Sequence, residues 1–258
     1  MTAESEPSVM TTALIPAYNE AKTIRDQLDR TLRFVGHVIL VDDGSTDGTA
    51  DLVNHPKVLV KRHPENLGKG ESLISGFEIA RDAGYDYVIT LDADGQHRPE
   101  DIPSLLARAN AGTIVVGSRM SQAHLIPKGR YRANQTANFF ISWAAGQWIQ
   151  DTQCGFRVYP IGLFDKIPLK RGRRSGFVTE SEILIEASRA GYCVVTVPVP
   201  ALYEAVLKRP SHFRPVRDIA AIVLMVTGKL LARWTYPSGL VRSWKQRTVD
   251  RDSRGLEI

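Results

Sequence analysis

Short apolar runs alternate with amphipathic stretches along the first half of the chain. The runs are rich in Val, Ile and Leu and end at polar loops, a pattern typical of buried strands. Between them apolar residues recur at helical spacing, as Ile24, Leu28 and Leu32 do. The predicted strands cover Thr11–Ile15, His37–Val41, Val58–Lys61, Tyr87–Leu91 and Thr113–Gly117. The predicted helices cover Glu20–Phe34, Thr49–Val53, Lys69–Ala83 and Pro99–Arg108.

This alternation predicts βαβ units, and therefore an α/β fold with a mainly parallel sheet flanked by helices. Ligands of such sheets bind beyond the carboxyl ends of the strands, so the polar loops there are the candidate sites. The less regular second half has predicted elements at Ala133–Ile149, Thr179–Ala190, Cys193–Val197 and Arg217–Trp234. We expect a flexible N-terminus at 1–10, a catalytic domain at 11–218, an apolar or interfacial helical segment at 219–245 and a flexible tail at 246–258.

The last apolar segment, Ile219–Trp234, has two interpretations. It is either a core helix that covers the sheet or an interfacial helix that lies on a membrane surface. Its uninterrupted apolar run ends at Gly228 and is shorter than the roughly 20 residues that a membrane span needs. We therefore expect a protein that does not cross a bilayer, and both interpretations of the segment stay open.

Composition narrows the class of protein. The chain has 258 residues, a net charge of +5 and two cysteines, Cys154 and Cys193, without the spacing of a metal site or a disulfide framework. The first ten residues are polar and acidic, unlike a secretory signal. We therefore expect a cytoplasmic protein with reduced thiols. The positive charge favours anionic partners, although charge alone does not separate nucleic acid, lipid phosphate and nucleotide.

Two carboxylates, Asp92 and Asp94, directly follow the predicted strand Tyr87–Leu91. With strand-like alternation they point to the same side, where they repel each other unless a cation joins them. Mg²⁺ or Mn²⁺ takes hard oxygen ligands, commonly one or two carboxylates together with substrate phosphates. Gln96 adds an amide oxygen two residues on. An isolated pair of this kind is more often a polar turn, so the interpretation depends on its surroundings.

Polar loops also follow the first two predicted strands. One is PAYNE, from Pro16 to Glu20, and the other is DDGSTDG, from Asp42 to Gly48. Each alone is explained as a helix entry, because Asn, Ser and Asp cap helices well. At adjacent strand ends the two loops together suit a nucleoside, with Tyr18 against the base and Glu20 or Asp43 on the ribose or the base edge.

The segments PAYNE, VDDGSTDGT, NLGKG, DADGQH and GSR occur in an order and spacing that resembles the family 2 glycosyltransferases, over about Thr11 to Asp218. The segment DTQCGFR, which begins at Asp151, resembles part of the dolichol- and polyprenyl-phosphate sugar synthases of that family. The resemblance implies a GT-A fold, which is Rossmann-like, and a C-terminal apolar or amphipathic helix. It also implies a nucleotide diphosphate sugar donor, a Mg²⁺ or Mn²⁺ cofactor, a lipid acceptor at a membrane surface and no nucleic acid partner.

Carried over by position, the resemblance also implies roles for single residues. Those implied to hold the nucleoside are Pro16, Tyr18, Glu20 and Asp43. Those implied to hold the metal are Asp94 and Gln96, with Asp92 on the metal or on the ribose. Arg119 is implied to contact the phosphates or the sugar of the donor.

Arginines are expected wherever phosphate is bound, because the departing nucleoside diphosphate gains charge that a planar guanidinium stabilises well. The candidates are Arg119, Arg132, Arg157 and Arg214. For each of them a surface ion pair is an equally good explanation. The strongest case is the loop with Ser211, His212 and Arg214, because a Ser/His/Arg loop before an apolar helix resembles a phosphate-binding loop of the family.

The acceptor decides whether a general base is needed. A lipid phosphate is already ionised at neutral pH, whereas a hydroxyl must lose a proton to a carboxylate in the transition state. Asp151 is the first candidate base, followed by Glu180 and Glu182. The expected catalytic set consists of Asp94, Arg119, Asp151 and Arg214. Direct displacement inverts the anomeric carbon in either case, as the resemblance also implies.

The leading hypothesis is an inverting glycosyltransferase that moves a hexose from GDP-mannose or a UDP-hexose to polyprenyl or dolichyl phosphate. We expect it to be peripheral, at the cytoplasmic face of the membrane. One alternative is a family 2 enzyme that acts on a glycan or lipid hydroxyl. Another is a catalytically inactive nucleotide-binding, membrane-associated protein, which the complete set of candidate metal ligands disfavours. A nucleotidyltransferase is disfavoured because the loop after the first strand is acidic and lacks glycine.

Overall fold

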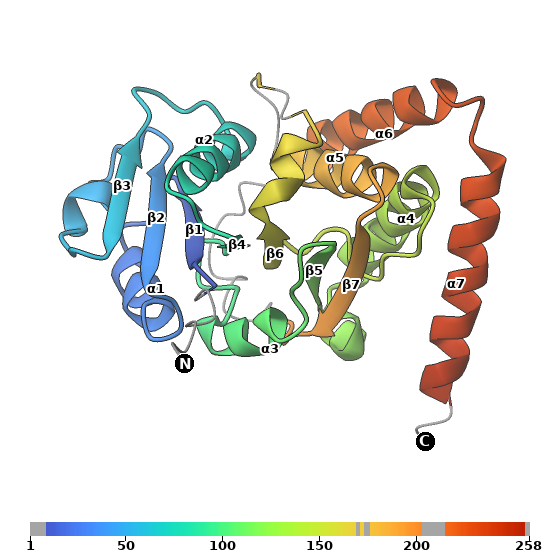
Figure 1. The fold of residues 1–258 in the computed structure, drawn as a ribbon, viewed down its shortest axis with the longest axis horizontal. Helices are drawn as coiled ribbons and strands as arrows, with labels where there is room; N and C mark the ends of the chain where they lie inside the picture. The colour runs from blue at the N-terminus through green and yellow to red at the C-terminus, as the bar shows by residue number, and fades with distance from the viewer. Residues whose placement is uncertain (1–8, 169–170, 173–175, 203–214, 256–258) are drawn as a thin grey trace, which may run out of the picture.

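The computed structural model describes residues 9–168, 171–172, 176–202 and 215–255. Its strands form one seven-stranded sheet in the order β3-β2-β1-β4-β6-β5-β7, flanked by helices (Figure 1). The strands are β1 (Thr11–Ala17), β2 (His37–Asp42), β3 (Val58–Arg62), β4 (Tyr87–Thr90), β5 (Thr113–Ser118), β6 (Arg157–Pro160) and β7 (Cys193–Pro198). The mainly parallel α/β fold predicted from the sequence is confirmed.

The helices lie along two sides of the sheet, with α1 and α3 on the lower side of the view and α2, α5 and α6 on the upper side (Figure 1). The α-helices are α1 (Ile24–Thr31), α2 (Lys69–Asp82), α3 (Ile102–Leu106), α4 (Lys128–Ala145), α5 (Gly176–Arg189), α6 (Pro215–Leu231) and α7 (Pro237–Gly255). Short 3₁₀ turns are η1 (Thr49–Leu52), η2 (Pro99–Asp101), η3 (Met120–Leu125) and η4 (Ile161–Asp165).

Strand β6 is the one strand of the sheet, as described, that runs against its neighbours. It pairs antiparallel with β4, where Thr90 faces Arg157, and with β5, where Val116 faces the same Arg157. The other strand pairs are parallel. As a result, the carboxyl ends of β1, β2, β4 and β5 and the amino end of β6 meet at one edge of the sheet, which brings the polar loops of the sequence together.

Two elements differ from the sequence-based expectation. Strand β6 was not predicted, because four residues bounded by Arg157 and Pro160 show neither alternation nor a long apolar run. Helix α4 ends at Ala145 instead of Ile149, because Gly146 adopts φ 75° and its N–H closes the last turn on the Ser142 carbonyl at 2.8 Å.

The C-terminal helices lie at the periphery of the molecule, with α7 packed outside α4 (Figure 1). Ile222, Val226 and Leu230 of α6 are buried. Helix α7 continues through Gly255, where the sequence predicted a polar tail after Gln246. The side chain of Gln246 accepts the backbone N–H of Trp148 at 2.7 Å, a tertiary contact that local sequence does not reveal. In the described part of the chain, none of the helices has the length and apolar character that crossing a membrane requires.

The core centres on strands whose side chains are buried on both faces, as parallel strands between two helical layers must be. Helix α2 crosses the central strand β1 closely at Gly76. A Cβ atom on Gly76 would lie 2.1 Å from Cδ1 of Leu14, which is fully buried. The distance between this helix and the sheet is therefore set by the absence of a side chain at Gly76.

We predict that Gly76→Ala lowers the free energy of unfolding by roughly 1 to 3 kcal/mol, because the added methyl group overpacks the contact with Leu14. Denaturant unfolding followed by circular dichroism measures the change. Gly129→Ala is the matched control, because Gly129 is also helical and a Cβ there meets nothing within 4 Å. An unchanged midpoint for Gly76→Ala would contradict this packing.

Candidate active site

The loops after β1 and β2 are joined by hydrogen bonds. The backbone N–H of Asn19 donates to Ser45 Oγ at 2.9 Å, and the N–H of Thr46 donates back to Asn19 Oδ1 at 2.8 Å. The N–H of Glu20 donates to Thr49 Oγ1 at 2.8 Å. Asn19 has φ 57°, a left-handed conformation that Asn tolerates better than most residues. The two segments that the sequence assigned to a nucleoside are therefore joined into one continuous wall, which consists of Pro16–Glu20 and Asp42–Gly48.

Three of the residues predicted at the nucleoside lie on or under this wall, at the end of β1. Pro16 is buried, and Tyr18 and Glu20 are half-buried. The carboxylate of Glu20 accepts a hydrogen bond from the Thr23 hydroxyl at 3.0 Å. It is also close enough to Asp94 to disfavour the charged form of that carboxyl group. The wall thus adjoins the predicted metal ligands.

The predicted nucleoside ligand Asp43 is buried and bound within the chain. Its Oδ1 accepts the backbone N–H of Leu67 at 3.0 Å, and its Oδ2 accepts that of Gly68 at 2.8 Å. His63 Nδ1 lies 2.8 Å from the same Oδ1. Asp43 therefore holds the NLGKG segment at the start of α2, a part that sequence reasoning did not assign to it.

The turn after β4 is stabilised from within. The N–H of Asp92 donates to His97 Nδ1 at 2.9 Å, and the N–H of Gln96 donates to Asp94 Oδ1 at 2.9 Å. The Gln96 side-chain amide bonds the other oxygen of Asp94. Burial lowers the pKa of His97 to about 4, so the ring is neutral near pH 7, with its proton on Nε2. The ring also stacks on Phe156 at 5.3 Å between centroids.

Lys69, the first residue of α2, places its ammonium group between two carboxylates. Its Nζ lies 2.6 Å from Asp92 Oδ1 and 3.4 Å from Glu180 Oε1 of α5. A Cβ atom on Gly155 would lie 2.9 Å from Glu180 Oε1 and 3.2 Å from Lys69 Nζ, so a larger residue there would displace the ends of these two side chains. Sequence reasoning did not select Lys69, although it lies within NLGKG.

This cation divides the carboxylate pair after β4 into two unlike groups. Burial alone would raise the pKa of Asp92, but the ion pair and hydrogen bond with Lys69, together with attraction to His97 and Arg119, outweigh burial and hold the pKa at about 2. Burial, followed by repulsion from Asp92, raises the pKa of Asp94 to about 6. The charge of Asp92 is therefore compensated by Lys69, whereas Asp94 forms no ion pair with a basic side chain among the described residues.

A divalent cation fits this imbalance. Mg²⁺ is often held by one or two carboxylates while phosphates and water complete its octahedron. Among the described residues, no group of three or more His, Cys, Asp and Glu side chains is arranged to hold a metal. Asp94, whose pKa is raised, is the carboxylate that would hold an ion of this kind together with a phosphate ligand.

Arg119, at the end of β5, forms a bidentate ion pair with Asp151. Its Nε and Nη2 lie 2.9 Å from the two carboxylate oxygens, and its backbone N–H donates to Asp151 Oδ2 at 3.1 Å. The Asp151 side chain is 0% exposed. This pairing argues against Asp151 as the general base, because its lone pairs are used and it is closed to solvent. Asp151 acts as a positioning residue for Arg119.

Arg157 lies in the core, where it has no surface for a phosphate. Its residue exposure is 1%. Its guanidinium donates to the carbonyls of Cys154 at 2.7 Å, Thr152 at 2.9 Å and Glu180 at 2.9 Å, and to the Tyr159 hydroxyl at 3.1 Å. The predicted phosphate contact of Arg157 is therefore wrong. The buried guanidinium of Arg157 instead joins the loop before β6 to helix α5.

The remaining predicted residues are dispersed. Arg132 is exposed on α4. Glu182, a candidate base, is buried and lies 2.9 Å from Lys229 of α6. Three predicted phosphate-binding residues lie outside the described residues: Ser211, His212 and Arg214.

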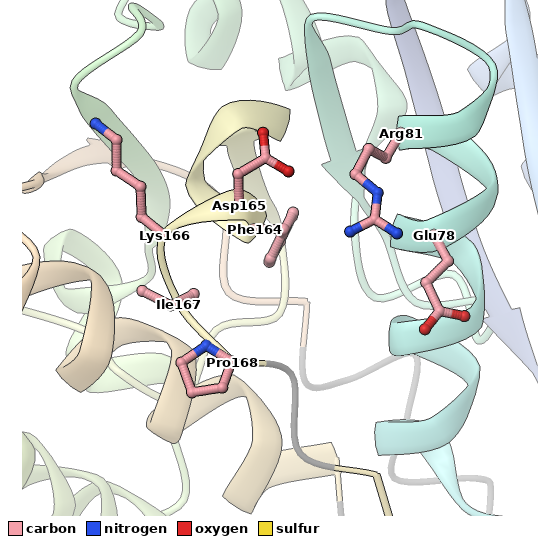
Figure 2. Close-up of a pocket in the computed structure, with 7 residues that line it drawn as sticks. All are labelled: Glu78, Arg81, Phe164, Asp165, Lys166, Ile167 and Pro168. Atoms are coloured by element: carbon pink, nitrogen blue, oxygen red, sulfur yellow. The ribbon is translucent and has the colours of Figure 1, made fainter.

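A cavity of about 450 Å³ lies away from these groups (Figure 2). Glu78 and Arg81 of α2 line one side, and the segment from Phe164 to Pro168 lines the other. Lys69 and Arg81 lie twelve residues apart on α2, which is about 18 Å of helix rise. The cavity holds no predicted site residue and charges of both signs, so it does not compete with the strand edge as the candidate site.

The sequence of the chain is similar to those of known glycosyltransferases. The sequence model described as Glycosyl transferase family 2 matches residues 12–171. The chain is similar to the polyprenol monophosphomannose synthase of Mycolicibacterium smegmatis, at 30% identity over 75% of this chain and 77% of the relative. It is also similar to the undecaprenyl-phosphate mannosyltransferase of Micrococcus luteus, at 30% identity over 86% of this chain and 94% of the relative.

Solved structures share the fold. The mannosyl-3-phosphoglycerate synthase of Rubrobacter xylanophilus superposes with a TM-score of 0.64 at 19% identity, over 87% of this chain and 75% of that one. The glucosyl-3-phosphoglycerate synthase of Mycobacterium tuberculosis, crystallised with Mg²⁺ and uridine diphosphate, gives 0.58 at 22% identity, over 88% and 79%. At this identity the likeness concerns the GT-A architecture alone.

We predict that Asp151→Asn lowers the free energy of unfolding by on the order of 3 kcal/mol, because it leaves the largely buried Arg119 without its counter-charge. Chemical denaturation measures the loss. Asp82→Asn, whose side chain is 76% exposed, is the control and should leave stability unchanged. A stable Asp151→Asn protein that has lost only activity would restore the general-base assignment.

Proposed function

The chain belongs to glycosyltransferase family 2, and from that premise we propose that it transfers a hexose from a nucleotide diphosphate sugar to a polyprenyl phosphate, with inversion. GDP-mannose or a UDP-hexose is the proposed donor, and Mg²⁺ or Mn²⁺ the proposed cofactor. We propose that residues 11–218 form the catalytic domain and that the helical segment 219–245 is attached to it. The proposed location is the cytoplasmic face of the membrane.

The observation that carries the proposal is the asymmetric pair of carboxylates after β4. Asp92 is compensated by Lys69 at 2.6 Å, while Asp94 is left with a raised pKa of about 6 beside the two joined loops. A divalent cation at Asp94 would supply charge stabilisation to the departing diphosphate. In this arrangement Tyr18 and Glu20 face the nucleoside, and Gln96 orients Asp94 through its amide.

The ion pairs of the carboxylates near the site bear on the choice between a phosphate and a hydroxyl acceptor. Asp151 is used by Arg119 at 2.9 Å, and Glu182 by Lys229 at 2.9 Å. A hydroxyl acceptor needs a general base, whereas a phosphate monoester supplies an ionised oxygen without one. A phosphate acceptor is therefore favoured, and the names of the two relatives, which act on polyprenyl phosphates, agree with it.

One observation keeps the hydroxyl acceptor as a second candidate. Oε1 of Glu180 is buried and accepts no hydrogen bond among the described residues, with only Lys69 Nζ within ion-pair distance. The two oxygens of Asp151 already accept hydrogen bonds from Arg119, whereas this oxygen of Glu180 keeps the capacity to accept a proton. Under this alternative Glu180, and not Asp151, is the general base.

The acceptor assay separates these two functions. Purified protein is incubated with Mn²⁺, a panel of radiolabelled nucleotide sugars and either a short polyprenyl phosphate or soluble glycans. The proposal expects label in the lipid fraction that mild acid releases as sugar. Transfer to a glycan together with no transfer to the lipid phosphate would replace the proposal with the hydroxyl alternative.

We predict that Asp94→Asn reduces turnover by at least a hundredfold, because the metal loses its main carboxylate and the leaving group loses charge stabilisation. Steady-state transfer rates at saturating donor measure the effect. Asp86→Asn is the control, because Asp86 is exposed and its carboxylate accepts the backbone N–H of Met10 at 2.8 Å. Turnover of Asp94→Asn within threefold of the parent would remove the assignment.

A further inference from the structure

From Ala220 onward, helix α6 has apolar residues on both its inner and its outer face, and its one charged side chain points inward. Between Ala220 and Ala232 the single charged residue is Lys229. Its Nζ turns inward to Glu182, at 2.9 Å, and to Glu186 of α5. A helix that faces water shows a different arrangement, with its apolar stripe toward the core and its charges in solvent.

The outer face of α6 is a continuous apolar stripe. The exposed residues follow helical spacing and carry no charge: Ala220, Val223, Leu224, Thr227, Gly228 and Leu231. Leu224 is 74% exposed and Leu231 66%. The inner face is separately satisfied by the buried Ile222, Val226 and Leu230. The residues of the stripe therefore do not contribute to the packing of α6 against the core.

The corner after α6 extends the stripe with a tryptophan. Trp234 is 93% exposed, and Trp234, Thr235 and Tyr236 all have φ between 48° and 61°. Left-handed conformations in three consecutive residues other than glycine are costly. The corner is held by Trp143 Nε1, which donates to the Tyr236 carbonyl at 3.1 Å. The corner thus places the indole of Trp234 outside the protein, at the end of the stripe.

The charged residues that follow the stripe in the sequence are all basic as far as Val249. From Ile219 through Val249 the sequence contains no Asp or Glu. Beyond Lys229 the basic residues are Arg233, Arg242, Lys245 and Arg247. Aromatic rings hold two of these side chains, with the Arg233 guanidinium 4.5 Å from the Tyr236 ring centroid and that of Arg247 4.9 Å from the Trp148 ring centroid.

We propose that the outer face of α6, with Trp234 and the basic residues beside it, docks on a bilayer that contains anionic phospholipid. Apolar side chains enter the acyl boundary, tryptophan suits the interface, and arginine and lysine pair with headgroup phosphates. A second copy of the chain fits less well, because a symmetric contact would bring two sets of basic residues together. This inference rests on the proposed function, because an enzyme with a polyprenyl phosphate acceptor has to reach a membrane.

The same surface is linked to the candidate site through α5. Glu180 of α5 lies beside Lys69 at the strand edge, and Glu182 and Glu186 of the same helix hold Lys229 of α6. Docking of α6 therefore fixes the height of α5, and with it the site, relative to the lipid surface.

The test is flotation of the full chain with phosphatidylcholine vesicles, with or without 30 mol% phosphatidylglycerol, and with no polyprenyl phosphate present. We expect binding to the anionic vesicles, and about tenfold weaker binding for Leu224→Ser and for Leu231→Ser, because each removes a side chain from the acyl boundary. Leu59→Ser is the matched control, since Leu59 is 50% exposed on β3 at the other end of the sheet. Circular dichroism checks that all variants fold.

Three results would overturn the proposal: no flotation of the parent chain, equal losses for Leu59→Ser and Leu224→Ser, or a lipid-free dimer in sedimentation velocity that Leu224→Ser dissociates. Sugar transfer to a short, water-soluble polyprenyl phosphate without vesicles tests the proposed function separately. A chain that floats without transferring sugar would contradict the function and support the surface. A chain that transfers sugar without floating would do the reverse.

Discussion

The ammonium group of Lys69 is the interaction on which the candidate site depends. It lies at the start of α2 and joins Asp92, from the end of β4, to Glu180, from α5. Without a cation between them these largely buried carboxylates would repel each other and the two elements would separate. A side chain at position 155 would displace the ends of Glu180 and Lys69, so Gly155 leaves room for the cluster. Because Lys69 pairs with Asp92 and not with Asp94, the carboxylate of Asp94 is left to bind a divalent cation.

The antiparallel strand β6 makes this cluster possible. It is inserted between β4 and β5, so the segment before it reaches the edge where the parallel strands end. Two buried arginines then fix that segment. Arg157 donates to its carbonyls, and Arg119 forms a bidentate pair with Asp151. Arginine suits both places because its planar group makes several hydrogen bonds in fixed directions.

The pattern of apolar and polar residues predicted the secondary structure, which depends mainly on local sequence. The strands and most helices follow from apolar spacing, and the joined loops after β1 and β2 follow from the rule that parallel strands end at one edge. Partners distant in the chain were not predictable. Asp43, Asp151 and Arg157 have the residue types of ligands, yet the structure uses their side chains to bind other parts of the chain. Lys69 was missed for the converse reason, since only the fold brings Asp92 and Glu180 to it.

The central claim is that a divalent cation and a nucleoside diphosphate bind together at Asp94, next to the joined loops. The most direct measurement is an anomalous difference map from crystals grown with Mn²⁺ and a nucleoside diphosphate. We predict a manganese peak bonded to the Asp94 carboxylate and to the diphosphate, with the base against the wall that carries Tyr18. A peak away from Asp94, or a nucleotide in the cavity beside Arg81, would contradict the account.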